Sequence, residues 1–148
     1  MNWFECKVSY EKTTETGVPK KVSESYLVDA LSFTEAEARI TKEITPFVSI
    51  GEFTISNIKR AKIAEIFEST DEMDDRYYKA KVLFITLDEK SGTEKKSPAN
   101  MIVHAGSLEG AVARLREEMD KGMATYEIAA ISDTTIMDIF PFENTIKE

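Results

Sequence analysis

Residues 32–40 read SFTEAEARI, and residues 107–115 read SLEGAVARL. Each stretch begins with a serine that can cap a helix and continues with apolar residues spaced three and four apart, which is typical of an amphipathic helix. Glu35 completes a capping box with Ser32, whereas Gly110 stands at the equivalent place in the second stretch. Two helices with the same start and the same apolar face indicate two diverged copies of one unit.

Two further blocks support this repeat and keep the same order along the chain. Residues 3–8 (WFECKV) match residues 77–82 (YYKAKV), and residues 53–67 match residues 126–140. The copies are offset by 74, 75 and 73 residues in the three blocks. The offset changes at an expected hairpin and at a helix-to-strand loop, where insertions are tolerated.

The segments around the helices have the pattern of strands. Apolar and polar residues alternate from residue 4 to residue 10 and again from residue 78 to residue 84, as in half-buried strands. Polar turns follow at residues 11–20 and 88–96 and predict hairpins. The returning strands are expected at residues 22–30 and 99–105, and the segments 52–67 and 125–140 predict either one bent strand or two short ones each.

These patterns predict an α+β protein of two pseudo-symmetric β-β-α-β repeats, or β-β-α-β-β repeats if each last segment is two strands. We expect antiparallel sheets, each covered by one helix. The expected divisions are a first repeat at 1–67, an acidic linker at 68–75, a second repeat at 76–140 and a tail at 141–148, all within one compact unit. The first helix is expected to bury a stripe made of Phe33, Ala36, Ile40, Ile44 and Phe47.

The net charge of −8 is unevenly distributed. Residues 68–75 (ESTDEMDD) hold five acids and no base, so the rest of the chain is nearly neutral. This segment superficially suggests a calcium loop, but it lacks the glycine and the terminal glutamate at the required spacing. A flexible, self-repelling linker is the favoured interpretation.

Metal, cofactor and catalytic motifs are not predicted. A single cysteine and a single histidine exclude an internal disulfide and a zinc site of several Cys or His ligands. Cys6 lies among apolar residues and is expected to be a buried small hydrophobic residue. Asp29 and His104 occupy equivalent positions in the two repeats and could form a carboxylate–imidazole pair if packing brings them close. The first residues do not have the pattern of a signal peptide, and no apolar run could span a bilayer, so the expected location is the cytoplasm.

The sequence resembles a family of short bacterial proteins of unknown function that are typical of gut anaerobes. The resemblance rests on residues 3–8, on residues 26–40 (YLVDALSFTEAEARI) and on residues 84–92 (FITLDEKSG), and it spans nearly the whole chain. It implies a cytoplasmic bacterial protein and carries no activity, cofactor or site.

Two groups of residues are candidates for binding a ligand or a partner. The outward face of the first strands would present aromatic and basic side chains, which can stack bases and neutralise phosphates or hold a protein. A basic cluster without a basic counterpart in the second repeat is the other group. The alternative interpretation is structural: the aromatic residues would pack between the two halves, and the cluster would protect a strand edge. The candidates are Trp3, Lys7, Tyr77 and Lys81 on the strands and Lys59, Arg60 and Lys62 in the cluster.

Three hypotheses about function follow. The first is a non-enzymatic binding or assembly module of the bacterial cytoplasm, with an unknown protein partner or as a homodimer. The alternative, which is less favoured, is a single-stranded nucleic-acid-binding protein that uses the aromatic and lysine face. A net-acidic chain usually argues against nucleic acid, but here the acidic excess is confined to residues 68–75, which weakens that argument. A small enzyme that uses His104 is the third.

Overall fold

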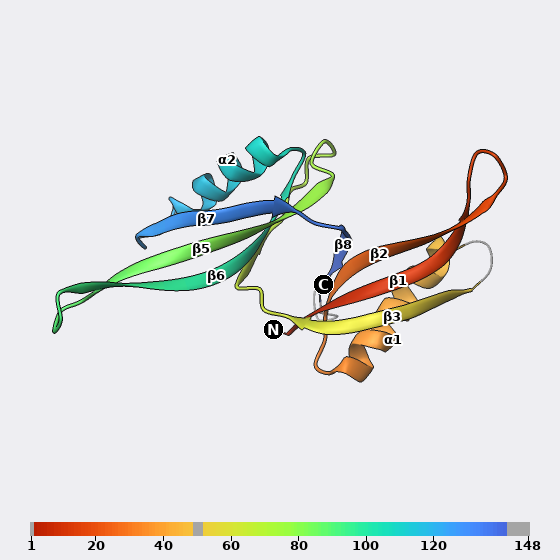
Figure 1. Ribbon diagram of the computed structural model, residues 1–148, viewed down its shortest axis with the longest axis horizontal. Helices are drawn as coiled ribbons and strands as arrows, with labels where there is room; N and C mark the ends of the chain where they lie inside the picture. The colour runs from red at the N-terminus through yellow and green to blue at the C-terminus, as the bar shows by residue number, and fades with distance from the viewer. Residues whose placement is uncertain (1, 49–51, 142–148) are drawn as a thin grey trace, which may run out of the picture. The chain divides into compact units, whose positions relative to one another are not determined.

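The computed structural model describes residues 2–48 and 52–141. It contains two helices and two four-stranded sheets, which confirms the α+β class (Figure 1). The predicted first repeat contains β1 (Trp3–Thr13), β2 (Pro19–Asp29), α1 (Phe33–Ile44), a short 3-10 helix η1 (Thr45–Phe47), β3 (Phe53–Ala61) and β4 (Glu65–Phe67). The predicted second repeat contains β5 (Arg76–Asp88), β6 (Thr93–Ala105), α2 (Leu108–Met119), β7 (Tyr126–Asp133) and β8 (Ile136–Phe140).

Each segment that follows a helix consists of two strands, so the longer β-β-α-β-β order holds. The strand orders are β3-β1-β2-β8 and β4-β6-β5-β7. Three strands of each sheet are antiparallel, but β8 pairs in parallel with β2, and β4 pairs in parallel with β6. The predicted antiparallel sheets are therefore confirmed for three strands of each sheet, and each sheet has in addition one parallel edge strand.

This pairing places the last strand of each predicted repeat in the sheet of the other predicted repeat, an arrangement called the strand exchange below. The chain divides into two compact units, residues 1–62 with 135–148 (unit 1) and residues 63–134 (unit 2). These boundaries differ from the predicted repeat boundaries, because β4 belongs to the sheet of unit 2 and β8 to the sheet of unit 1. The crossings fall in short connections, residues 62–64 between β3 and β4 and residues 134–135 between β7 and β8.

An arginine on each helix holds the strand received from the other repeat. In unit 1, Arg39 donates one hydrogen bond to the Asp29 carbonyl oxygen and another, of 2.9 Å, to that of Pro141, the residue after β8. In unit 2, Arg114 donates to the carbonyl oxygen of Glu68, the residue after β4. Charged donors make strong hydrogen bonds, so these contacts help to fix the ends of the exchanged strands.

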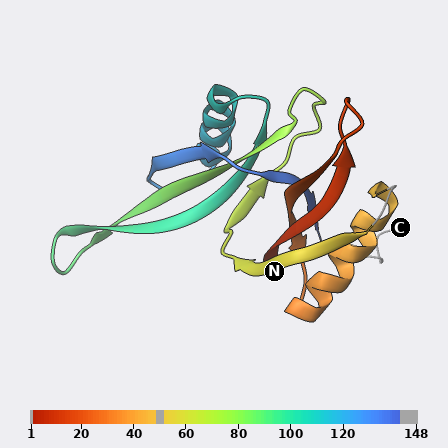
Figure 2. The ribbon, with the colours of Figure 1, turned by 45° about the vertical axis from the view of Figure 1, so that its right-hand side comes forward.

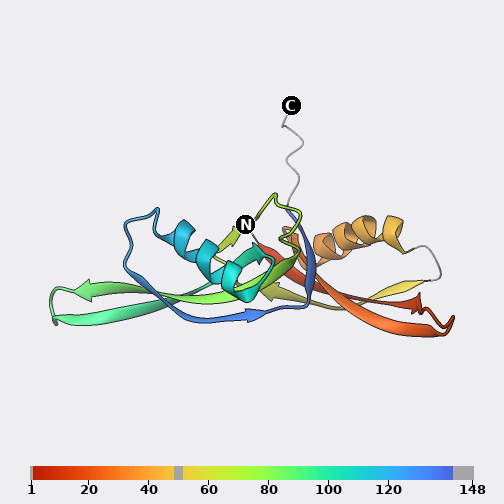
Figure 3. The same cartoon turned by 90° about the horizontal axis from the view of Figure 1, so that it is seen from above.

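A single helix covers one face of each sheet, and the core lies between them (Figure 3). In unit 1, Phe4, Cys6 and Val8 of β1 pack with the apolar face of α1. Tyr78, Ala80 and Val82 of β5 have the same place under α2 in unit 2. Figure 2 shows the β5–β6 hairpin extending past α2, and its residues 86–98 are exposed.

The start of α1 forms as predicted, but two of its expected core residues are exposed. Ser32 Oγ accepts a hydrogen bond from Glu35 N at 3.1 Å, and a Glu35 carboxylate oxygen accepts one from Leu31 N at 2.7 Å. Phe33 is 46% exposed and Phe47 is 77% exposed. Phe47 lies beyond the end of α1 in η1, where the helical spacing no longer predicts the buried face.

The acidic segment 68–75 is a turn with internal hydrogen bonds, and it lies inside unit 2. Ser69 Oγ donates to Asp74 Oδ2 at 2.5 Å, and Asp71 Oδ1 accepts from Met73 N at 2.9 Å. The Met73 carbonyl oxygen lies 2.6 Å from where a side-chain carbon on Gly106 would stand. Only a glycine allows this approach. Within residues 2–48 and 52–141, no group of three His, Cys, Asp or Glu side chains could hold a metal ion.

Gly106→Ala is expected to destabilise the protein by about 1–3 kcal/mol, because the new methyl group must displace backbone rather than a flexible side chain. Gly122→Ala is the matched control, since its added carbon would meet the Met119 carbonyl oxygen at 3.6 Å, an ordinary contact. Urea unfolding of both variants measures the difference. Equal stability of the two variants would show that residues 68–75 are not packed against Gly106.

Candidate site on the open face of the unit 1 sheet

The face of the unit 1 sheet opposite α1 is its open face. Successive strand residues point to opposite sides, so Glu5, Lys7 and Ser9 lie on the open face while Phe4, Cys6 and Val8 face the helix. The pairing register then brings side chains from the neighbouring strands into the same rows. Lys7 lies between Ser25 of β2 and Asn57 of β3, and Glu5 lies between Leu27 and Lys59.

A hollow of about 390 Å³ opens on this face, and all seven side chains that line it are polar or charged. Its volume is at the small end of the range of ligand sites, about 300–1,000 Å³. Strands β1, β2 and β3 supply six of the lining residues, and the start of the exchanged segment supplies the seventh. The lining residues are Glu5, Lys7, Ser23, Ser25, Asn57, Lys59 and Thr135.

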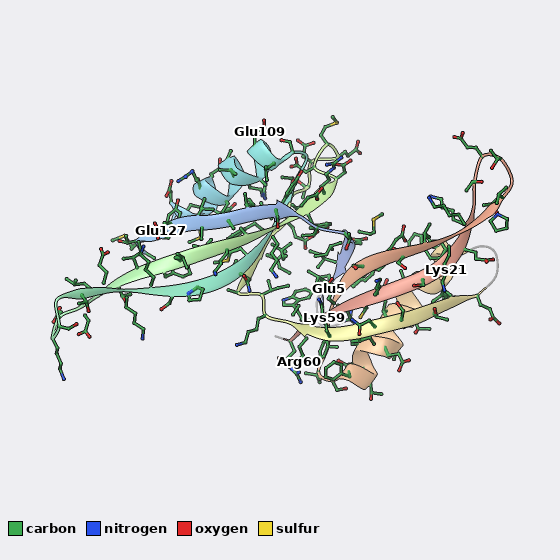
Figure 4. All side chains as sticks on the ribbon, in the orientation of Figure 1. Glu5, Lys21, Lys59, Arg60, Glu109 and Glu127 are labelled. Atoms are coloured by element: carbon green, nitrogen blue, oxygen red, sulfur yellow. The ribbon has the colours of Figure 1, made fainter. Side chains whose placement is uncertain are left out.

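The charges of the hollow leave one ammonium group without an ion pair. Lys59 Nζ lies 3.9 Å from a Glu5 carboxylate oxygen, and Figure 4 shows these two side chains together on β3 and β1. In the described part of the chain, no ion pair joins Lys7 to a carboxylate. Two lysines and one glutamate give the hollow a net charge of about +1 within a chain of net charge −8.

Hydroxyl groups continue the polar surface on both sides of Lys7. Ser9 Oγ lies 3.0 Å from Ser23 Oγ and donates to Ser56 Oγ at 3.3 Å. Thr135 Oγ1 donates to Ser25 Oγ at 3.3 Å, and the Thr135 carbonyl oxygen accepts from Ser25 N at 3.4 Å. Residues that lie far apart in the sequence therefore meet only because β8 pairs with β2.

The equivalent face of unit 2 has a different chemistry. The β1–β3 pairing shifts by one residue between Lys7 and Val8, and the β5–β7 pairing shifts at the same place, between Lys81 and Val82. The two registers can therefore be compared position by position. Lys81 lies between Asn100 and Ala130, and Leu83, the equivalent of Ser9, lies between Pro98 and Glu127. The bulge belongs to both sheets, whereas the hydroxyl groups around it belong to unit 1.

The structure places three of the seven predicted site residues on the open face of unit 1. Trp3, Lys7 and Lys59 lie on this face, with Trp3 half-buried at the start of β1. Arg60 points the other way: its guanidinium carbon lies 5.2 Å from the centre of the Phe4 ring and 5.5 Å from that of Phe33. The adjacent bases Lys59 and Arg60 therefore do not form one patch, because strand residues alternate between faces.

The other three predicted residues lie elsewhere. Lys62 is exposed in the connection between β3 and β4. Tyr77 and Lys81 lie on β5 of unit 2, where the Tyr77 ring stacks on His104 with ring centres 4.3 Å apart and planes at 8°. One face of the Tyr77 ring is thus already occupied by an imidazole.

His104 has a structural environment within unit 2. Its Nδ1 accepts a hydrogen bond from Ser69 N at 3.2 Å, so this nitrogen carries no proton in that arrangement. Asp29, which was considered as its partner, belongs to unit 1. The contacts of His104 connect β6 to the acidic turn.

Several residues of the hollow were not among the predicted site residues. Strand alternation could have placed Glu5, Ser23 and Ser25 beside Lys7, since all four lie on odd-numbered positions of a hairpin. Asn57 was hidden by the bulge, which shifts the register of β3 by one residue. Thr135 had no signal in the sequence, because only the strand exchange brings it to β2.

The fold and the site define an α+β protein whose two sheets share one strand order and whose polar hollow lies in unit 1. The chain matches the model of the family described as "Domain of unknown function (DUF4494)" over residues 2–142, and it belongs to that family. This finding confirms the resemblance to a family of unknown function over nearly the whole chain. No curated protein matches the chain. In the described residues, no helix is long and apolar enough to cross a membrane.

Cys6 lies directly under the open face and is fully buried, as predicted. Burial, with a smaller effect of the Glu5 charge, raises the pKa of the Cys6 thiol to about 11. The folded state therefore favours the protonated thiol, while in an unfolded chain the thiol has its ordinary pKa of about 8.5. The contribution of the protonated Cys6 thiol to the free energy of unfolding is complete below about pH 8.5 and is lost as the pH rises toward 11.

Unfolding free energies of the wild type and of Cys6→Ala, measured from pH 7.5 to 10.5, test this linkage. The wild type is expected to lose more stability than the variant over this range, because only the wild type has a thiol that ionises on unfolding. Parallel pH profiles for the two proteins would contradict the raised pKa of Cys6.

Proposed function

We propose that this protein is a non-enzymatic binding module whose ligand site is the open face of the unit 1 sheet. The observation that carries the proposal is the polar hollow around Lys7 and Lys59, which lies on paired strands. Rigid strands hold side chains in place, so little entropy is lost when a ligand is bound.

The difference between the two units supports this role. Their helix-facing positions carry the same kinds of residue, as in Phe4, Cys6 and Val8 against Tyr78, Ala80 and Val82. Around the bulge, unit 1 has hydroxyl and amide groups on both sides of Lys7 and at Ser9, whereas unit 2 has the amide of Asn100 on one side of Lys81, Ala130 on the other, and Leu83 in the place of Ser9. The divergence of the open faces is what a binding site in one unit would produce.

Single-stranded nucleic acid is the alternative ligand. This ligand is favoured by one observation: an aromatic ring, Trp3, and two ammonium groups, Lys7 and Lys59, lie on the same open face. A strand of nucleic acid needs successive aromatic platforms, and none of the residues lining the hollow is aromatic. Small polar molecules therefore fit the hollow better than bases do. A protein partner or a second copy of the chain is the other occupant to be tested.

Trp3 is the single tryptophan, and it lies on the same face of β1 as Lys7, about 13 Å away along the strand. We expect its fluorescence to show no salt-sensitive quenching by oligonucleotides at low and high salt. In parallel, backbone NMR spectra of the full chain are recorded with a broad panel of small polar metabolites. At least one of them is expected to shift the signals of Lys7, Ser25 and Asn57.

The outcomes separate the hypotheses. Quenching by oligonucleotides that disappears at high salt and in Lys7→Ala would favour nucleic acid. If no metabolite in the panel shifts the open-face signals, the proposed function is wrong. A change in sedimentation with protein concentration that open-face substitutions abolish would favour a homodimer on this face.

A further inference from the structure

The Lys7 ammonium group is the centre of the hollow. Lys7 lies on β1, between β2 and β3, with Ser25 on one side and Asn57 on the other. Its side chain is exposed. Because the Glu5 carboxylate lies against Lys59, the positive charge of Lys7 is left uncompensated among the described residues. An ammonium group in this position offers hydrogen bonds to a negatively charged oxygen.

The groups beside Lys7 include donors for the same anion. Ser25 Oγ already accepts a hydrogen bond from Thr135 Oγ1, so its own hydroxyl proton is available to donate. The Asn57 side chain carries an amide that can donate from the other side of Lys7. An ammonium, a hydroxyl and an amide in one row across three strands suit a phosphate or carboxylate group.

The remainder of the lining suits hydroxyl groups on the ligand. Ser23, Thr135 and Glu5 supply acceptors and donors, and the lining has no apolar side chain to hold a hydrocarbon or an aromatic ring. The Lys59 ammonium can donate to the ligand as well, because its distance of 3.9 Å from Glu5 is long for a hydrogen bond. The volume of about 390 Å³ limits the ligand to a small molecule.

We propose that the hollow binds a small hydroxylated acid, a molecule with one phosphate or carboxylate group at Lys7 and several hydroxyl groups along Ser23, Thr135 and Glu5. This inference rests on the proposed function and names the ligand class of the same site. The anionic group is held by Lys7, Ser25 and Asn57, and the Lys59 ammonium, whose charge Glu5 compensates, can donate a further hydrogen bond.

Isothermal titration of the full chain with glucose 6-phosphate, gluconate, glucose and inorganic phosphate tests the proposal. At least one of the two hydroxylated acids is expected to bind, and glucose is expected to bind at least about tenfold more weakly, because it lacks the charge-assisted hydrogen bonds. Inorganic phosphate is expected to bind more weakly than the preferred acid, since it leaves the hydroxyl contacts unmade. The preferred acid identifies the anionic group as phosphate or carboxylate.

Two lysine variants provide the matched pair. Lys7→Gln is expected to weaken binding of the preferred acid at least about tenfold, through loss of the charged donor. Lys81→Gln changes the equivalent lysine of unit 2, which lies between Asn100 and Ala130, and is expected to leave the affinity unchanged. Circular dichroism and thermal unfolding establish that both variants are folded before they are titrated.

Three results would overturn the proposal. Equal affinity for glucose and glucose 6-phosphate would show that the hollow binds sugars without recognising the phosphate group. The proposed binding function would stand in that case. Equal losses in Lys7→Gln and Lys81→Gln would show general charge attraction rather than a site. Binding of neither acid would exclude this ligand class, and the NMR panel would then decide whether the face binds anything else.

Discussion

The parallel pairing of β8 with β2, and of β4 with β6, is the constraint on which the rest of the structure depends. Without it, each sheet would have three strands, and β2 and β6 would become edge strands with unpaired backbone groups on one side. The exchange pairs part of those groups with residues from the other predicted repeat. It also explains why the helix arginines, Arg39 and Arg114, both donate to a carbonyl group just beyond a received strand.

The same pairing connects the candidate site to the fold. Thr135 begins the segment that enters unit 1, and its hydrogen bonds to Ser25 place it in the wall of the hollow. The hollow is thus complete only when the exchanged strand is in place. The two faces of this sheet differ in chemistry: apolar residues pack under α1, and the open face carries the polar groups of the hollow next to one fully buried apolar residue, Leu27.

Much of the architecture could be predicted from periodicity. Alternation at residues 4–10 and 78–84 located the first strands, and Ser32 with Glu35 located the start of α1. Phe47 was wrongly expected to be buried, because the 3.6-residue period applies only while the helix continues. At the site, Lys7 and Lys59 were identified, but their neighbour Arg60 was assigned to the same patch although it packs on Phe4 and Phe33.

The sequence by itself determined the α+β class, the two helices and the strands that alternate, because these depend on residues near one another in the chain. The partners of β4 and β8, the turn formed by the acidic segment, and the meeting of Lys7, Asn57 and Thr135 in one hollow were decided only by the tertiary structure. Short strands of three and five residues carry too little pattern to specify a partner. Their pairing is set by which sheet edge the crossing connection can reach, and that is a property of the folded chain.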